Sequence, residues 1–141
     1  MKTTNDNPKR ILIVEDEPTI CDVCRRVLVG EGLEVDIAAN GKVAQGMIEE
    51  KQYDLYLIDI RTPEMNGKEL HQWLQAKHPR LTNGVIFTTG DVLDGDIRSF
   101  LEQTTRPFLP KPFTPAEIKA IVGEVLKEAK NGRRADKNSG C

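Results

Sequence analysis

The stretch DLYLIDIRTPEMNG, residues 54–67, decides the fold of this chain. It contains an unbroken apolar run, Leu55 to Ile58, which ends at Asp59, and a loop with Pro63 follows. Short unbroken apolar runs are typical of parallel strands that are buried on both faces. The stretch therefore predicts a central strand that places the carboxylate of Asp59 at its carboxyl end.

Four other segments have the pattern of strands. Residues 11–14 and 85–87 are apolar runs, residues 33–38 alternate as a half-exposed edge strand does, and residues 108–109 are a short fifth candidate. Helical patterns fill the intervals, at residues 18–30, 40–48, 67–77, 92–101 and 114–126. The strict alternation predicts an α/β fold with an open, doubly wound, five-stranded parallel sheet covered by helices on both faces.

Length, charge and hydropathy limit the classes of function. The 141 residues fit one ordinary domain, and 20 basic against 22 acidic residues leave a net charge of -2. That balance does not attract nucleic acid or a membrane surface. The polar start is not a signal peptide, and no apolar run approaches the ~20 residues of a membrane helix. We expect a cytoplasmic domain at residues 10–129, between polar tails at 1–9 and 130–141, with no nucleic acid and no membrane as partner.

Polar side chains follow the predicted strands at their carboxyl ends, where open α/β sheets bind ligands. Glu15 and Asp16 follow the first strand, Asp59 the third, Thr89 the fourth and Lys111 the fifth. A carboxylate such as Asp59 is a poor nucleophile toward an anionic phosphoryl group, and neighbouring carboxylates add like-charge repulsion. Phosphoryl chemistry here needs a divalent cation, and Mg²⁺ prefers hard oxygen ligands of this kind.

Four stretches carry a resemblance to a known family. They are residues 11–18 (ILIVEDEP), 54–67 (above), 85–91 (VIFTTGD) and 107–113 (PFLPKPF). In this order and spacing they resemble the receiver domains of bacterial two-component response regulators, and the likeness covers about Arg10 to Leu126. The resemblance implies a flavodoxin-like three-layer fold with strand order 2-1-3-4-5. It also implies a signalling domain that catalyses its own phosphorylation and dephosphorylation and turns over no independent substrate.

The resemblance assigns roles to individual residues. Asp59 would take the phosphoryl group from the phosphohistidine of a sensor histidine kinase or of a phosphotransfer domain. Lys111 and the Thr89 hydroxyl would stabilise the charge of the phosphoryl oxygens. The cofactor would be Mg²⁺, with Mn²⁺ as a substitute. Its expected ligands are Glu15, reached through water, Asp16, Asp59 and the main-chain carbonyl of Arg61.

The same resemblance implies a conformational switch. Thr89 would move toward the phosphoryl group, and the aromatic ring of Phe108 would move inward behind it. Phe108 lacks the tyrosine hydroxyl found in many members, so burial of the ring is the only part of this response left. The Lys111–Pro112 bond is expected to be cis. A downstream protein would bind the face made by the fourth helix, fifth strand and fifth helix.

Two charged residues flank the predicted phosphoryl site. Arg61 lies two positions after Asp59, and Asp91 lies two positions after Thr89. We expect their opposite charges to pair across the site, restrict the attacking water and prolong the phosphorylated state.

Other polar residues carry weaker signals. Cys21 and Cys24 form a C-x-x-C pair, but they lie on or beside the apolar stripe of a helix, and no second ligand pair completes a zinc site. We expect them to be small apolar fillers. Cys141 lies in the expected tail. His71 and His78 are expected to be solvated.

The same residues argue against two other classes of function and leave one open. No glycine-rich phosphate loop follows the first strand, which argues against a nucleotide-binding enzyme. A phosphatase of the haloacid-dehalogenase kind needs an Asp-x-Asp pair, whereas the first and third strands here are followed by Glu15-Asp16-Glu17 and Asp59-Ile60-Arg61. A receiver-like interaction module that is not phosphorylated stays open as an alternative, although Asp59, Thr89 and Lys111 together argue against it. The domain either stands alone or belongs to a hybrid histidine kinase, and the irregular fourth helical segment mildly favours the hybrid.

Overall fold

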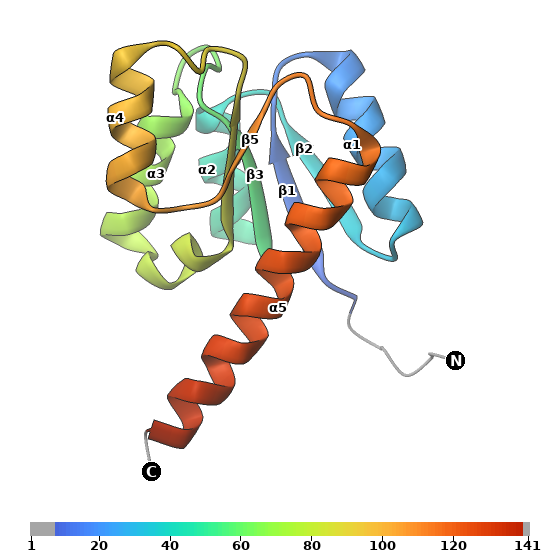
Figure 1. Ribbon diagram of the computed structural model, residues 1–141, viewed down its shortest axis with the longest axis vertical. Coiled ribbons are helices and arrows are strands. Elements are labelled where there is room, and N and C mark those ends of the chain that lie inside the picture. Colours follow the sequence, from blue (N-terminus) through green and yellow to red (C-terminus); the bar gives the residue numbers. More distant parts are fainter. Residues whose placement is uncertain (1–7, 140–141) are drawn as a thin grey trace.

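The computed structural model describes residues 8–139, and its elements alternate in the predicted order (Figure 1). The strands are β1 (Arg10–Val14), β2 (Glu34–Ala38), β3 (Leu55–Asp59), β4 (Val85–Thr89) and β5 (Phe108–Pro110). The helices are α1 (Pro18–Gly30), α2 (Gly41–Glu50), α3 (Gly67–Lys77), α4 (Gly95–Thr104) and α5 (Pro115–Ser139). A 3-10 helix that we did not predict, η1 (Pro79–Gly84), precedes β4.

The five strands form one parallel sheet in the order β2-β1-β3-β4-β5. This confirms the predicted doubly wound α/β fold and its strand order. The strands at the centre, β1, β3 and β4, are almost wholly buried, whereas β2 at one edge is half exposed. Because all strands run the same way, their carboxyl ends meet at one edge of the sheet, and that edge carries the predicted site.

Helices cover both faces of the sheet (Figure 1). The α1 and α5 face packs on one apolar cluster, which includes Ile11, Leu57 and Ile118. The face covered by α2, α3 and α4 packs on a second cluster, which includes Tyr56 and Phe87. Strand residues therefore alternate between two cores, as expected for a sheet covered on both sides.

Side-chain caps fix where several helices begin. The Asn40 side chain accepts a hydrogen bond from the Val43 N–H at 2.9 Å, which caps the start of α2. Thr114 and Glu117 form a reciprocal capping box at the start of α5. The predicted start of the fourth helix at Val92 is wrong by three residues. Asp94 is the N-cap, so the aspartates and Gly95 begin the helix and do not interrupt it.

The C-terminal helix is longer than expected. Residues 130–141 were expected to form an aperiodic tail, but α5 continues through Ser139 and projects beyond the sheet (Figure 1). The segment contains no proline, and its two lysines and two arginines favour helix without needing an apolar stripe. Residues 1–7 of the other expected tail lie outside the described part of the chain. Among residues 8–139, no helix combines the length and apolar character needed to cross a membrane.

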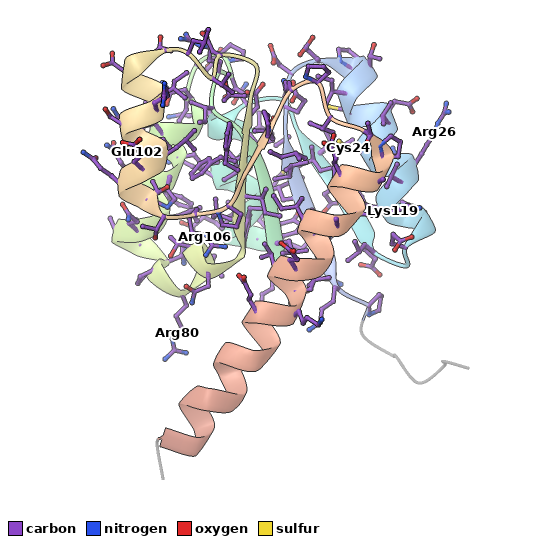
Figure 2. All side chains as sticks on the ribbon, viewed as in Figure 1. Cys24, Arg26, Arg80, Glu102, Arg106 and Lys119 are labelled. Carbon is purple, nitrogen blue, oxygen red and sulfur yellow. The ribbon has the colours of Figure 1, made fainter. Side chains whose placement is uncertain are left out.

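The predictions for the cysteines and histidines had different outcomes. Cys24 is 0% exposed and fills the core between α1 and the sheet, as predicted, in contrast to charged side chains such as Arg26 and Arg80, which project into solvent (Figure 2). The prediction that His71 is solvated is wrong, because its ring is 2% exposed and packs edge-on against Phe87 and Phe100. His78 is half buried and packs against Trp73. Cys141 lies outside the described residues.

Candidate functional site

Three carboxylates meet at the carboxyl edge of the sheet. Glu15 follows β1, Asp16 comes next, and Asp59 ends β3. One oxygen from each of the three lies within 4.8 Å of the other two. Glu15 and Asp59 are only 3% and 4% exposed, whereas Asp16 is open to solvent. The sequence placed these residues at two strand ends, and parallel pairing of β1 with β3 brings them together.

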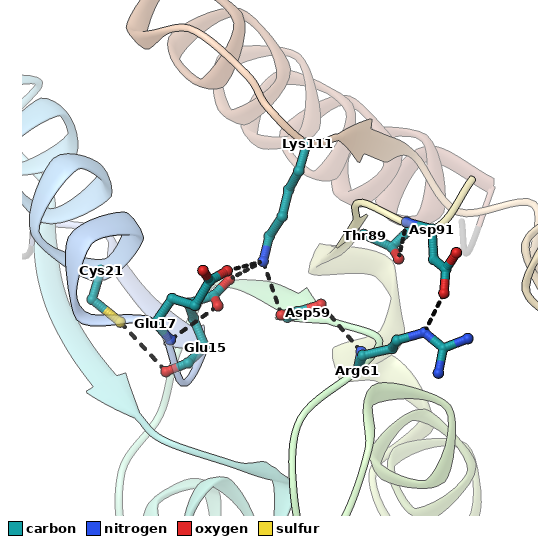
Figure 3. Close-up of polar contacts among 8 residues, drawn as sticks. All are labelled: Glu15, Glu17, Cys21, Asp59, Arg61, Thr89, Asp91 and Lys111. Carbon is teal, nitrogen blue, oxygen red and sulfur yellow. Dashed lines mark hydrogen bonds and ion pairs between the residues drawn. The ribbon is translucent and has the colours of Figure 1, made fainter. Parts of the chain in front are cut away.

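The ammonium group of Lys111 lies inside this cluster (Figure 3). Its Nζ is 2.9 Å from Glu15 Oε1, 3.0 Å from Asp59 Oδ2 and 3.2 Å from Glu17 Oε1. Glu17 was not predicted as a contact of Lys111. The lysine reaches the cluster from the end of β5, and the Lys111–Pro112 bond that follows is cis, as expected.

Burial and charge perturb the proton equilibria of the cluster. Burial raises the pKa of Glu15 to about 7, with the negative charge of Asp59 adding to the effect and the hydrogen bond from Lys111 opposing it. Burial alone would lower the pKa of Lys111, but hydrogen bonds to Glu15 and Asp59 outweigh it and raise that pKa. The lysine therefore stays charged and offsets part of the repulsion among the carboxylates.

The donor set fits a hard divalent cation. Three carboxylate oxygens converge, one of the three residues faces solvent, and Mg²⁺ is usually bound through one or two carboxylates while it keeps several waters. Softer metals would want sulfur or imidazole ligands. Neither of the two cysteines in the described part of the chain supplies one: the Cys21 thiol donates to the main-chain carbonyl of Glu15 at 3.4 Å, and burial raises the pKa of Cys24 to about 12.

The switch candidates lie beside the cluster. Thr89 ends β4 and is 1% exposed, and its hydroxyl accepts a hydrogen bond from the Asp91 N–H at 3.0 Å (Figure 3). Among the described residues, the hydrogen bonds to the Asp59 side chain come from Arg61 and Lys111, not from Thr89. Phe108 pairs with Phe87 at the start of β5 and is half buried.

Arg61 and Asp91 form the expected ion pair, with Arg61 Nε 2.7 Å from Asp91 Oδ2 (Figure 3). The sequence did not indicate a second partner. Arg61 Nη2 also lies 3.0 Å from Oδ2 of Asp94, the N-cap of α4. The Arg61 N–H donates to Asp59 Oδ1 at 3.1 Å, which fixes the orientation of that carboxylate.

Hydrogen bonds hold the loop between β3 and α3 against α2 and against the end of β3. The carbonyl of Met65 accepts hydrogen bonds from the Gly41 N–H at 2.9 Å and from the Thr62 hydroxyl at 2.8 Å. The Gly67 N–H donates to the Ile60 carbonyl at 2.9 Å, and a Cβ at Gly67 would lie 2.8 Å from the Asp59 carbonyl oxygen. Only glycine permits this approach, so the loop that follows Asp59 is held close to the strand.

Fold and site together define a class of protein. A buried aspartate lies among carboxylates suited to Mg²⁺, with a charged lysine in contact and a threonine hydroxyl at the next strand end, on an open parallel α/β sheet. Phosphoryl transfer requires this combination of a cation site and charge-stabilising donors. The site is therefore that of a metal-assisted phosphoacceptor domain.

Comparison with known proteins gives the same answer. The model of the response regulator receiver domain family matches residues 11–123, and the chain belongs to that family, the phosphoacceptor domains of two-component signalling. The DNA-binding response regulator MtrA of Mycolicibacterium smegmatis is 32% identical over 121 residues, which are 84% of this chain and 51% of MtrA. The chain thus spans about half the length of this curated relative.

Solved structures agree with the family. A CheY-like receiver domain from Methanospirillum hungatei superposes with a TM-score of 0.81 at 31% identity, covering 89% of this chain and 99% of that one. The response regulator TrrA of Thermotoga maritima, solved in complex with Mg²⁺ and BeF, gives a TM-score of 0.70 at 31% identity, covering 83% of this chain and 98% of TrrA. Receiver domains bind Mg²⁺ at acidic sites of this kind, and they interact with histidine kinases and effector domains.

Proposed function

We propose that Asp59 is the phosphoryl acceptor and that it takes the group from the phosphohistidine of a sensor histidine kinase or of a phosphotransfer domain in the cytoplasm. The contact that carries the proposal is the one between Lys111 Nζ and Asp59 Oδ2, at 3.0 Å within the carboxylate cluster. An oxygen of Asp59 forms a bond to phosphorus, and the phosphorus–nitrogen bond of the donor breaks. The imidazole of the donor retains the electron pair of that bond.

The residues around Asp59 would stabilise the charge of the phosphoryl group and hold the cation. Lys111 is already charged and within reach of the acceptor, so it can follow the phosphoryl oxygens with little reorganisation. Thr89 lies at the neighbouring strand end and offers its hydroxyl to another oxygen. Mg²⁺, with Mn²⁺ as a substitute, would neutralise charge on the transferred group. The residues that would hold it are Glu15, Asp16, Asp59 and the main-chain carbonyl of Arg61.

The output surface in this proposal is the face made by α4, β5 and α5. Movement of Thr89 toward the phosphoryl group vacates space behind it, and Phe108 on β5 is the half-buried ring available to fill that space. The partner would be a downstream protein and neither nucleic acid nor a membrane, because the chain has a net charge of only -2. The domain would catalyse its own phosphorylation and dephosphorylation only.

A phosphodonor assay tests the proposal. Wild-type protein is incubated with Mg²⁺ and acetyl phosphate and its intact mass is measured, with Asp59→Asn as the matched variant and a sample containing a metal chelator. We expect one acid-labile phosphate adduct on the wild type and none on the variant or in chelator. No adduct on the wild type would favour the interaction module that is not phosphorylated, and an adduct on Asp59→Asn would place the acceptor elsewhere.

A further inference from the structure

Arg61 is the one residue that contacts both the proposed acceptor and the segment leading to α4, among the contacts of the described residues. Its main-chain N–H donates to Asp59 Oδ1, and its guanidinium contacts Asp91 at 2.7 Å and Asp94 at 3.0 Å. Figure 3 shows the side chain extending from the end of β3 toward the segment after β4. The main chain of Arg61 therefore contacts the proposed acceptor, while its side chain contacts the β4–α4 segment.

Asp94 uses its two carboxylate oxygens for different tasks. Oδ1 accepts hydrogen bonds from the Asp96 and Ile97 N–H groups at 2.9 and 3.1 Å, which is the N-cap of α4. Oδ2 accepts from Arg61. The Asp94 side chain is 32% exposed, against 50% for Asp91, so the contact with Asp94 is the less hydrated of the two. The same carboxylate thus orders the first turn of α4 and ties it to Arg61.

The first turn of α4 is anchored by the buried side chain of Ile97 and by the ion pair of Asp94 with Arg61. A cavity of about 580 Å³ separates the first turn from the β3–α3 loop, with Ile60, Pro63, Ile97 and Phe100 among its lining residues. Ile97 and Phe100 anchor the inner side of the helix in the core, whereas the side chain of the N-cap Asp94 is 32% exposed. Arg61 and Asp94 both line this cavity, and their ion pair joins the β3–α3 loop to the N-cap of α4.

We propose that Asp94 is a positioning residue that holds the first turn of α4 against Arg61 in the unphosphorylated state and so couples Asp59 to α4. The inference rests on the proposed role of Asp59. When Thr89 turns toward a phosphoryl group it leaves the Asp91 N–H, and displacement of this segment pulls on both carboxylates that hold Arg61. The Arg61–Asp94 pair is then stronger in the unphosphorylated state than in the phosphorylated one. An interaction that differs in strength between two states shifts the equilibrium between them, here toward the unphosphorylated state.

Asp94→Asn separates the two tasks of the carboxylate. Asparagine caps helices about as well as aspartate, so the helix start is retained while the charge that holds Arg61 is lost. The control is Glu102→Gln, which makes the same charge change on the same helix at an exposed residue (Figure 2). The probe is beryllofluoride with Mg²⁺, which mimics a phosphoryl group on a carboxylate, and the measurement is its dissociation constant by calorimetry.

We expect beryllofluoride to bind Asp94→Asn about two- to fivefold more tightly than wild type, the range that exposed ion pairs allow. The difference should shrink in 1 M salt, because screening there acts over about 3 Å. Arg61→Gln should reproduce the gain, and the double variant should gain no more than either single variant. Glu102→Gln should bind as wild type does.

Three results would overturn the inference. They are equal affinity of Asp94→Asn and wild type, an equal gain in Glu102→Gln, and full additivity of Arg61→Gln with Asp94→Asn. Should Asp94→Asn fail to fold, Arg61→Gln against wild type decides alone, and an unchanged affinity there rejects the coupling. If wild type itself binds no beryllofluoride in Mg²⁺, the proposed function fails first, and that failure is distinct from the others.

Discussion

Lys111 Nζ lies 2.9 Å from Glu15 Oε1, so a buried carboxylate that is 3% exposed has its counter-charge supplied by the chain itself. Lys111→Met keeps the length of the side chain and removes the charge. Because one partner of a buried pair is lost, we expect the free energy of unfolding without metal to fall by about 3 kcal/mol, the low end for such pairs. The Lys111 side chain is 13% exposed, so partial solvation keeps the loss of stability near the lower limit for buried pairs.

The same variant should respond more strongly to Mg²⁺. The carboxylates lose their internal cation, so the rise in melting temperature on adding Mg²⁺ should be larger for Lys111→Met than for wild type. Thermal melts with and without Mg²⁺ measure this, and Lys119→Met serves as the control at an exposed lysine. An equal response of Lys111→Met and wild type would show that Lys111 and the metal do not share the charge of this cluster.

Arg61 and Asp91 pair at 2.7 Å, and we expect this pair to restrict the water that attacks the phosphorylated Asp59. Arg61→Ala should therefore dephosphorylate faster, by up to about fivefold, because the pair is exposed and worth at most about 1 kcal/mol. The rate is followed as loss of the phosphate adduct after the donor is removed. An unchanged or slower rate would refute the idea.

His71 is buried between two phenylalanine rings, and burial lowers its pKa below the usual 6.5, with Arg106 adding to the effect. The unfolded chain therefore binds a proton at a higher pH than the folded one does. Stability from this residue is complete above pH 6.5 and is lost as the pH falls below it. In denaturant melts from pH 7.5 to 5, the free energy of unfolding of wild type should fall relative to that of His71→Phe, and a difference independent of pH would contradict this.

Two helical glycines should respond in opposite ways to alanine. A Cβ at Gly46 in α2 meets nothing within 4 Å, so Gly46→Ala should stabilise the protein by about 0.5–1 kcal/mol. Gly67→Ala would press on the Asp59 carbonyl and the Ile60 Cα, both at 2.8 Å, and should destabilise it by about 1–3 kcal/mol. Urea melts compare the two, and a stabilising Gly67→Ala would mean that the loop can yield.

Sequence patterns predicted the strands, the strand ends and most helices because those features depend on local periodicity. The β3 run from Leu55 to Ile58 and the Thr114–Glu117 capping box are both visible within a few residues. The start of α4 was misplaced because Asp94 and Gly95 disfavour a helix interior and favour its first turn, and one sequence does not distinguish the two positions.

Other features depend on contacts between distant segments. Arg61 and Asp94 are 33 positions apart, and their pairing depends on how α4 approaches the β3–α3 loop. The burial of His71 had a local signal that was overlooked, since it lies between Leu70 and Leu74 on the inner side of α3. The Glu17 contact with Lys111 spans 94 positions and has no local signal.

The Met65 carbonyl accepts hydrogen bonds from the Gly41 N–H and from the Thr62 hydroxyl. Gly41 therefore helps to hold the loop that follows Asp59, although it does not belong to the proposed site. A Cβ there would lie 2.6 Å from that oxygen, so a larger residue would displace the loop that leaves Asp59. In a genetic screen, substitutions at Gly41 would cluster with those at the phosphoryl site, although Gly41 belongs to α2 on the far side of the loop. Substitutions that impair signalling would thus be found at the residues that hold this loop, such as Gly41, as well as around the proposed acceptor Asp59.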